Sequence, residues 1–98
     1  MFQVIWTFTV APEYVAAFER AYGPAGPWAA LFRRSAGYLG TELFRSTAEP
    51  GQYLTVDRWA SRPTYETAQR RHAKAYAQLD AECDTLTVTE KLLGSVGE

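Results

Sequence analysis

Apolar and polar residues alternate along the first ten positions of the chain. From Phe2 to Val10, every second residue of FQVIWTFTV is apolar or aromatic, and the residues between them are polar except for Ile5. Alternation with a period of two is typical of a strand with one buried face. We therefore predict a strand over residues 2–10.

Two helical segments are predicted after this strand. Apolar residues recur at helical spacing from Val15 to Tyr22, behind Pro12, which the first turn of a helix tolerates. The following stretch GPAGPW is rich in Gly and Pro, which end a helix and turn the chain. We expect a first helix over roughly residues 12–22 and a second, shorter one that begins near Trp28.

The middle of the chain predicts a hairpin followed by a third helix. Residues 38–46 and 53–59 are rich in β-forming residues, and the connection AEPGQ has the composition of a turn. Ser61 and Pro63 suit the N-cap and the first turn of a helix. Residues 86–96 alternate weakly, which predicts a fourth strand.

The third helix carries the chain's single histidine. Residues spaced by three or four positions share one face of a helix. The residues on that inward-facing stripe are Tyr65, Ala68, His72, Tyr76, Leu79 and Cys83. We expect His72 to face inward among apolar neighbours, and Cys83 to be a small buried hydrophobe.

The predicted order of elements is β-α-α-β-β-α-β. This order is typical of an α+β protein with the ferredoxin-like split β-α-β fold, in which helices cover one face of a four-stranded antiparallel sheet. Residues 1–98 are expected to form a single domain. Ile5, Leu39, Leu43 and Leu93 are expected on the uncovered face, which favours a homodimer that pairs the two sheets.

Composition excludes several classes of protein. The chain has 98 residues, is 47% hydrophobic and carries ten Lys and Arg against eleven Asp and Glu, without the basic stripe that nucleic acid requires. One Cys and one His cannot build a disulfide framework or a structural metal site. Because no signal peptide and no long apolar run are visible, we expect a cytoplasmic protein without a membrane partner.

The chain resembles the antibiotic biosynthesis monooxygenase family of dimeric α/β-barrel proteins over nearly its whole length. The resemblance is carried by FTVAPEYVAAFERAYGPAGPWAALFRRSAGYLGTELF (residues 8–44) and YLTVDRWASRPTYETA (residues 53–68). It implies oxidation of a small aromatic or phenolic substrate, polyketide- or quinol-like, by dioxygen without a metal, flavin or other cofactor. It also implies catalytic roles for Trp59 and Tyr65, since some relatives use a Trp at the end of the third strand and a Tyr six residues later.

Two alternatives stay open within the same resemblance. One branch of the family degrades heme with an Asn, a Trp and a His; this chain has no Asn, although His72 could still ligate iron. Other relatives have different activities or none established. A non-catalytic small-ligand-binding or stress-related dimer is therefore the second alternative.

Cofactor-free oxygenation requires a base and a dry cavity that places the substrate. His72 is our candidate base, because the unperturbed pKa of histidine is about 6.5. Tyr65 could bond a substrate oxygen, and Trp59 could stack on an aromatic ring. The aromatic residues expected to line the substrate pocket are Phe8, Phe18, Tyr22, Phe32 and Phe44.

Each candidate also has a structural interpretation. A histidine on an apolar stripe and aromatic residues at a strand end often belong to the core. Strict alternation places Trp59 on the more polar face of its strand, unless a bulge near Asp57 re-aims it. Asp57, which precedes Arg58, is interpreted as structural.

Overall fold

Four strands form one antiparallel sheet in the computed structural model, which describes residues 1–97. Their order across the sheet is β2-β3-β1-β4, which confirms the ferredoxin-like topology. The strands span Phe2–Thr9 (β1), Tyr38–Arg45 (β2), Gln52–Trp59 (β3) and Thr89–Gly97 (β4).

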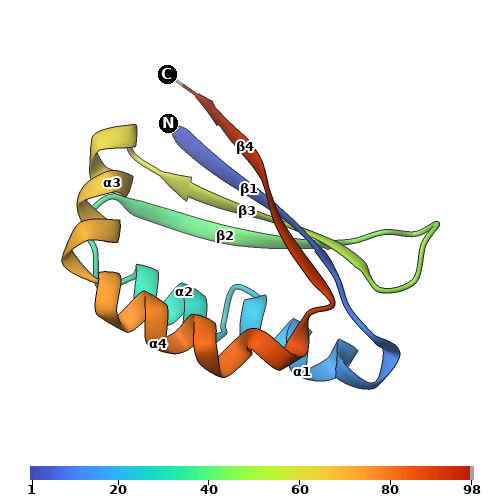
Figure 1. Cartoon of the computed structure of the whole chain (residues 1–98). Helices are drawn as coiled ribbons and strands as arrows, with labels where there is room; N and C mark the ends of the chain where they lie inside the picture. The colour runs from blue at the N-terminus through green and yellow to red at the C-terminus, as the bar shows by residue number, and fades with distance from the viewer. Residues whose placement is uncertain (98) are drawn as a thin grey trace.

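The helices cover one face of this sheet. They are the 3-10 turn η1 (Pro12–Tyr14), α1 (Val15–Tyr22), α2 (Pro27–Phe32), α3 (Arg62–Arg71), α4 (Ala73–Cys83) and the 3-10 turn η2 (Asp84–Leu86). Figure 1 shows α1, α2 and α4 on the same side of the sheet, with α3 standing at the end where β3 finishes. None of these helices, within residues 1–97, has the length and apolarity to cross a membrane.

The third predicted helix is two helices. Ser61 caps α3 as expected, because its hydroxyl accepts a hydrogen bond from the Thr64 N–H at 3.2 Å. The prediction of one continuous helix is wrong at His72, whose φ of −116° and ψ of 20° lie outside helical geometry. The break lets the chain leave the end of the sheet and run beneath it as α4 (Figure 1).

The hydrogen-bond register decides which side chains face the helices. Val4 lies opposite Asp57, and Asp57 lies opposite Thr41, so these three residues share the face that the helices cover, here called the inner face. The opposite face, which carries Ile5 and Val56, is called the outer face.

Leu43 was expected on the outer face, and this prediction is wrong. The register of β2 shifts between Tyr38 and Gly40, where Leu39 is an extra residue. Leu43 therefore lies opposite Thr55 on the inner face and packs against the hydrophobic core. A bulge reverses the parity of alternation, so residues after it change face.

Two buried clusters pack between the sheet and the helices. One is centred on Phe18, which is 0% exposed, and includes Cys83, buried as predicted. The other is centred on Trp59, which is 1% exposed. Both clusters hold the helices against the sheet and so fix the walls of the space between them.

Nothing within residues 1–97 covers the outer face. Phe44 and Val96, which pair with Leu54 and Gln3 in the register, are 46% and 51% exposed. Leu39 and Leu93, at the two register shifts, are 57% and 61% exposed. This face therefore carries several large apolar side chains in contact with water.

Candidate functional site

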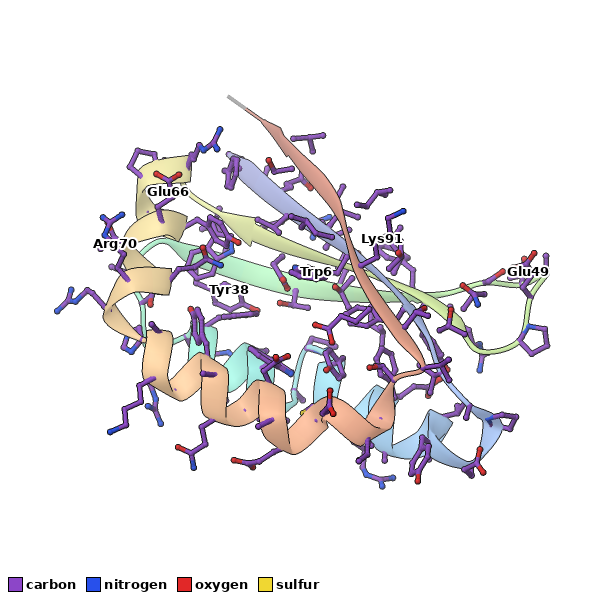
Figure 2. All side chains as sticks on the ribbon, in the orientation of Figure 1. Trp6, Tyr38, Glu49, Glu66, Arg70 and Lys91 are labelled. Atoms are coloured by element: carbon purple, nitrogen blue, oxygen red, sulfur yellow. The ribbon has the colours of Figure 1, made fainter. Side chains whose placement is uncertain are left out.

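A cavity of about 310 Å³ lies between the inner face and the helices. Small-ligand sites have volumes of about 300–1,000 Å³, so this cavity suits a small molecule. Seven of its fifteen lining residues are aromatic: Trp6, Phe8, Tyr22, Trp28, Phe32, Tyr65 and Tyr76. Figure 2 shows Trp6 and Tyr38 on the side of the sheet that faces the helices.

The buried charged residue of the cavity wall is Asp57, near the end of β3. Its side chain is 8% exposed. The Thr41 hydroxyl on the neighbouring strand donates to Asp57 Oδ1 at 2.7 Å, and the Tyr38 hydroxyl lies 2.5 Å from Thr41 Oγ1. Because the Thr41 proton is directed to Asp57, Tyr38 donates to Thr41. A row of hydroxyl groups thus ends on the Asp57 carboxylate.

Burial raises the pKa of Asp57 to about 6, and the Thr41 hydrogen bond lowers it only in part. Arg58, the next residue, pairs with Glu42 and cannot compensate the charge of Asp57, because neighbouring strand residues face opposite sides of the sheet. At neutral pH the cavity therefore contains a carboxylate that is mostly ionised but poorly stabilised.

Three tyrosine hydroxyls lie near this carboxylate. Burial raises the pKa of Tyr38, Tyr65 and Tyr76, the last to about 12, and the nearby charge of Asp57 raises each of them further. Gln69 Nε2 donates to the Tyr65 hydroxyl at 2.7 Å. The phenols stay protonated at neutral pH, so Tyr65 and Tyr76, which line the cavity, are available as hydrogen-bond donors.

The pair Trp59 and Tyr65, singled out from the sequence, lies together at one end of the cavity. Tyr65 lines the cavity, whereas Trp59 lies behind it with the two ring centroids 5.6 Å apart in an edge-to-face arrangement. Within residues 1–97, the buried indole N–H of Trp59 has no hydrogen-bond partner. Trp59 is on the inner face through plain alternation, since the bulge lies in β2 and β3 itself keeps a regular register with β1.

His72 lies away from this cavity. It is half-buried at the junction of α3 and α4 and borders a separate surface depression together with Arg34 and Arg71. Its ring centroid is 6.3 Å from that of Tyr76. The structure therefore does not bring His72 together with Tyr65 on the cavity wall.

The five aromatic residues expected around the pocket divide into three groups. Phe8, Tyr22 and Phe32 line the cavity. Phe18 lies behind Phe8 and Tyr22 in the core, with ring centroids 5.1 and 4.4 Å away. Phe44 is on the outer face, on the other side of the sheet.

Sequence reasoning missed the residue with the most unusual environment, Asp57, and gave it a structural role. The sequence did contain a signal for its place in the site, because alternation put Asp57 on the same face of the strand as Trp59. Trp6, Trp28 and Tyr76 were also missed as cavity residues. Their helical and strand spacings predict burial, but burial alone does not separate a cavity wall from a packed core.

Solved structures show the same fold at low sequence identity. SnoaB, a cofactor-independent oxygenase from Streptomyces nogalater, has a TM-score of 0.71 and 19% identity, covering 99% of this chain and 91% of its own. A protein of Deinococcus radiodurans, assigned to antibiotic biosynthesis monooxygenases, has a TM-score of 0.78 and 16% identity, with coverages of 100% and 92%. One from Bordetella bronchiseptica, assigned likewise, has a TM-score of 0.74 and 21% identity, with coverages of 99% and 95%.

Among curated proteins, none matches the sequence. The sequence profile of one family, Antibiotic biosynthesis monooxygenase, matches residues 1–79, which include β1 to β3 and most of the helices around the cavity. Since this match covers well over half of the 98 residues, the chain belongs to the antibiotic biosynthesis monooxygenase family.

Proposed function

We propose that the protein is a cofactor-independent monooxygenase that oxidises a small phenolic molecule with dioxygen inside the cavity. The observation that carries this proposal is an aromatic-walled cavity of about 310 Å³ that also presents a buried carboxylate and tyrosine hydroxyls. Family membership supports it, as does the shared fold with the cofactor-independent oxygenase SnoaB.

The proposed reaction converts an activated carbon–hydrogen position into a carbonyl. In an anthrone-type substrate, a CH₂ group becomes C=O: one oxygen atom of dioxygen bonds to the carbon, and the other leaves as water with the two hydrogens. Dioxygen is the oxidant, and the electron-rich substrate supplies the electrons. The protein contributes placement, exclusion of water and proton transfer.

The proposed roles of the residues follow from their positions. Tyr65 donates a hydrogen bond to a substrate oxygen, because its hydroxyl is at the cavity wall and stays protonated. Trp59 is a positioning residue that holds the Tyr65 ring from behind. A catalytic role for His72 would have to act through Tyr76, since the two rings are neighbours and His72 does not line the cavity.

The proposed assembly is a homodimer formed through the outer face. Its exposed apolar side chains include Phe44 and Val96, and such a face is usually covered by a partner. Light scattering at micromolar concentration should give about 22 kDa, twice the chain mass of 11.0 kDa. A mass of one chain under these conditions would refute this assembly.

Oxygen uptake with a panel of anthrones and hydroquinones tests the activity. Tyr65→Phe keeps the ring and removes the hydroxyl, so turnover should fall by roughly 10²-fold if that hydroxyl holds the substrate oxygen. Tyr14→Phe is the matched control, because Tyr14 is 41% exposed and lies outside the cavity. Equal rates for wild type and Tyr65→Phe would remove the role of Tyr65.

The same assay separates the alternative functions. Binding of panel molecules without any oxygen uptake would support a ligand-binding dimer in place of an enzyme. A heme iron bound by His72 would lie outside the cavity, because the chain's single histidine borders the separate depression. The geometry therefore favours the phenolic ligand over heme in the cavity.

A further inference from the structure

Asp57 differs from the other acidic residues of the cavity wall. Asp80 and Glu90 also border the cavity, but both side chains are exposed. Asp57 is buried on the inner face, and its hydrogen bond from Thr41 occupies only Oδ1. A carboxylate accepts several hydrogen bonds, so Asp57 has acceptor capacity left for a ligand.

The groups that surround Asp57 include no positive charge in the part of the chain that the structure describes. β1 places Val4 beside it, and β2 places Thr41 and, through Thr41, Tyr38. The helices contribute Tyr65 and Tyr76, and the charge of Asp57 raises the pKa of both hydroxyls.

The nearby charged side chains point elsewhere. Arg33 on the α2 side donates to the Pro24 carbonyl, and Arg62 lies over the Phe2 ring. Figure 2 shows Glu66 and Arg70 on the side of α3 turned away from the cavity. No Lys or Arg of residues 1–97 borders the cavity.

We propose that Asp57 is the proton acceptor of the cavity, and that the ligand it selects is a neutral aromatic molecule whose hydroxyl is acidified by a conjugated electron-withdrawing group such as a carbonyl. In the proposed step, the O–H bond of the ligand breaks and an O–H bond forms on a carboxylate oxygen of Asp57. The negative charge moves from Asp57 to the ligand oxygen, and no electron leaves the ligand.

The negative charge of the site explains why the ligand should be neutral and why its hydroxyl should be acidified. A ligand that arrives as a phenolate meets the like charge of Asp57 in a site that lacks a compensating cation, whereas a neutral hydroxyl donates to it. An ordinary phenol has a pKa of about 10, far above that of a carboxylate. Transfer is therefore favoured only for an acidified hydroxyl whose new charge is stabilised by donors such as Tyr65 and Tyr76.

The consequence for oxidation rests on the proposed function. A phenolate gives up an electron to dioxygen more readily than a phenol, so the proton transfer prepares the ligand for oxygenation. Binding and proton acceptance by Asp57, however, can be measured without oxygen chemistry.

Binding of 4-nitrophenol provides the test, because its neutral and ionised forms absorb at different wavelengths. Titrations from pH 4.5 to 9 should give wild-type affinity that is highest where Asp57 is ionised and the probe is neutral. Affinity should fall by about 10-fold or more on both sides, since a charge-assisted hydrogen bond is lost at low pH and like charges meet at high pH.

Asp57→Asn should abolish the maximum in the plot of 4-nitrophenol affinity against pH. The variant lacks the negative charge, so it should bind the ionised probe at high pH better than wild type does. Asp84→Asn, an exposed aspartate in η2 outside the cavity, is the matched control and should behave as wild type. The methyl ether 4-nitroanisole has no proton to donate and should bind wild type and Asp57→Asn within about 2-fold.

Thr41→Val keeps the test decisive if Asp57→Asn does not fold. It removes the hydrogen bond that lowers the pKa of Asp57, so the low-pH side of the wild-type curve should move to higher pH. The proposal is overturned if Asp57→Asn, or Thr41→Val in its place, leaves the pH curve of 4-nitrophenol unchanged.

The two proposals can fail separately. The expected binding curves without oxygen uptake would support Asp57 as the acceptor and reject the monooxygenase. Oxygen uptake that Asp57→Asn retains with the same pH profile would support the monooxygenase and reject Asp57.

Discussion

The burial of Asp57 predicts that this residue destabilises the folded protein at neutral pH. Its pKa rises from an ordinary 3.8 to about 6 on folding, chiefly because burial disfavours the charged form. The folded state therefore binds the Asp57 proton more tightly than the unfolded state does. The destabilisation is absent well below pH 3.8, grows as pH rises towards the folded-state pKa and is complete above about pH 6.

The size of this effect follows from the shift. A rise of about 2 pKa units corresponds to a destabilisation of about 3 kcal/mol at pH 7. At pH 4, where Asp57 is mostly protonated in the folded state, the same relation gives a destabilisation of about 0.5 kcal/mol. In Asp57→Asn, the new amide oxygen would still accept the Thr41 hydrogen bond, but the NH₂ group would face the cavity. Asp57→Asn should therefore raise the free energy of unfolding by about 2 kcal/mol at pH 7 and change it little at pH 4.

Urea unfolding of wild type and Asp57→Asn at pH 4, 5, 6 and 7 measures this difference. Both proteins are compared at equal protomer concentration, because a dimer's stability depends on concentration. Taking the difference between the two proteins removes the titration of all other groups, and Asp84→Asn controls for the loss of one surface charge. A difference that stays constant from pH 4 to pH 7 would refute the assignment of a raised pKa to Asp57.

Substitutions at three further positions, Trp59, Phe44 and Gly37, test other parts of the structure. Trp59→Ala should lower the free energy of unfolding by about 3–5 kcal/mol, and Trp59→Phe by less, because the side chain is 1% exposed; urea midpoints measure both. Phe44→Glu places a charge on the outer face and should convert the proposed dimer into an 11.0 kDa monomer by light scattering, whereas Thr47→Glu in the hairpin should not. Gly37→Ala should lower the free energy of unfolding in urea by about 1–3 kcal/mol, because Gly37 has φ +88° and the added Cβ would lie 2.2 Å from Thr64 Cγ2. Wild-type stability of this variant would contradict that packing.

Local patterns in the sequence were sufficient to predict the order of elements, except for the division of the third helix into α3 and α4. Alternation predicted β1, the hairpin composition predicted β2 and β3, and Ser61 with Pro63 predicted the start of α3. These signals are local because strand periodicity, turn composition and capping each depend on residues close together in the chain. A split β-α-β order leaves few ways to arrange the sheet, so the topology followed.

Contacts between distant segments decided the character of the site. The bulge at Leu39 brought Leu43 to the inner face, and the break at His72 moved the histidine away from the cavity. Asp57 acquired its raised pKa from burial under helices, which the hydrogen bond from a hydroxyl 16 positions earlier in the chain offsets only in part. Periodicity predicts which residues share a face, but the dielectric environment and hydrogen bonds of a buried group depend on everything packed around it, which only the tertiary structure defines.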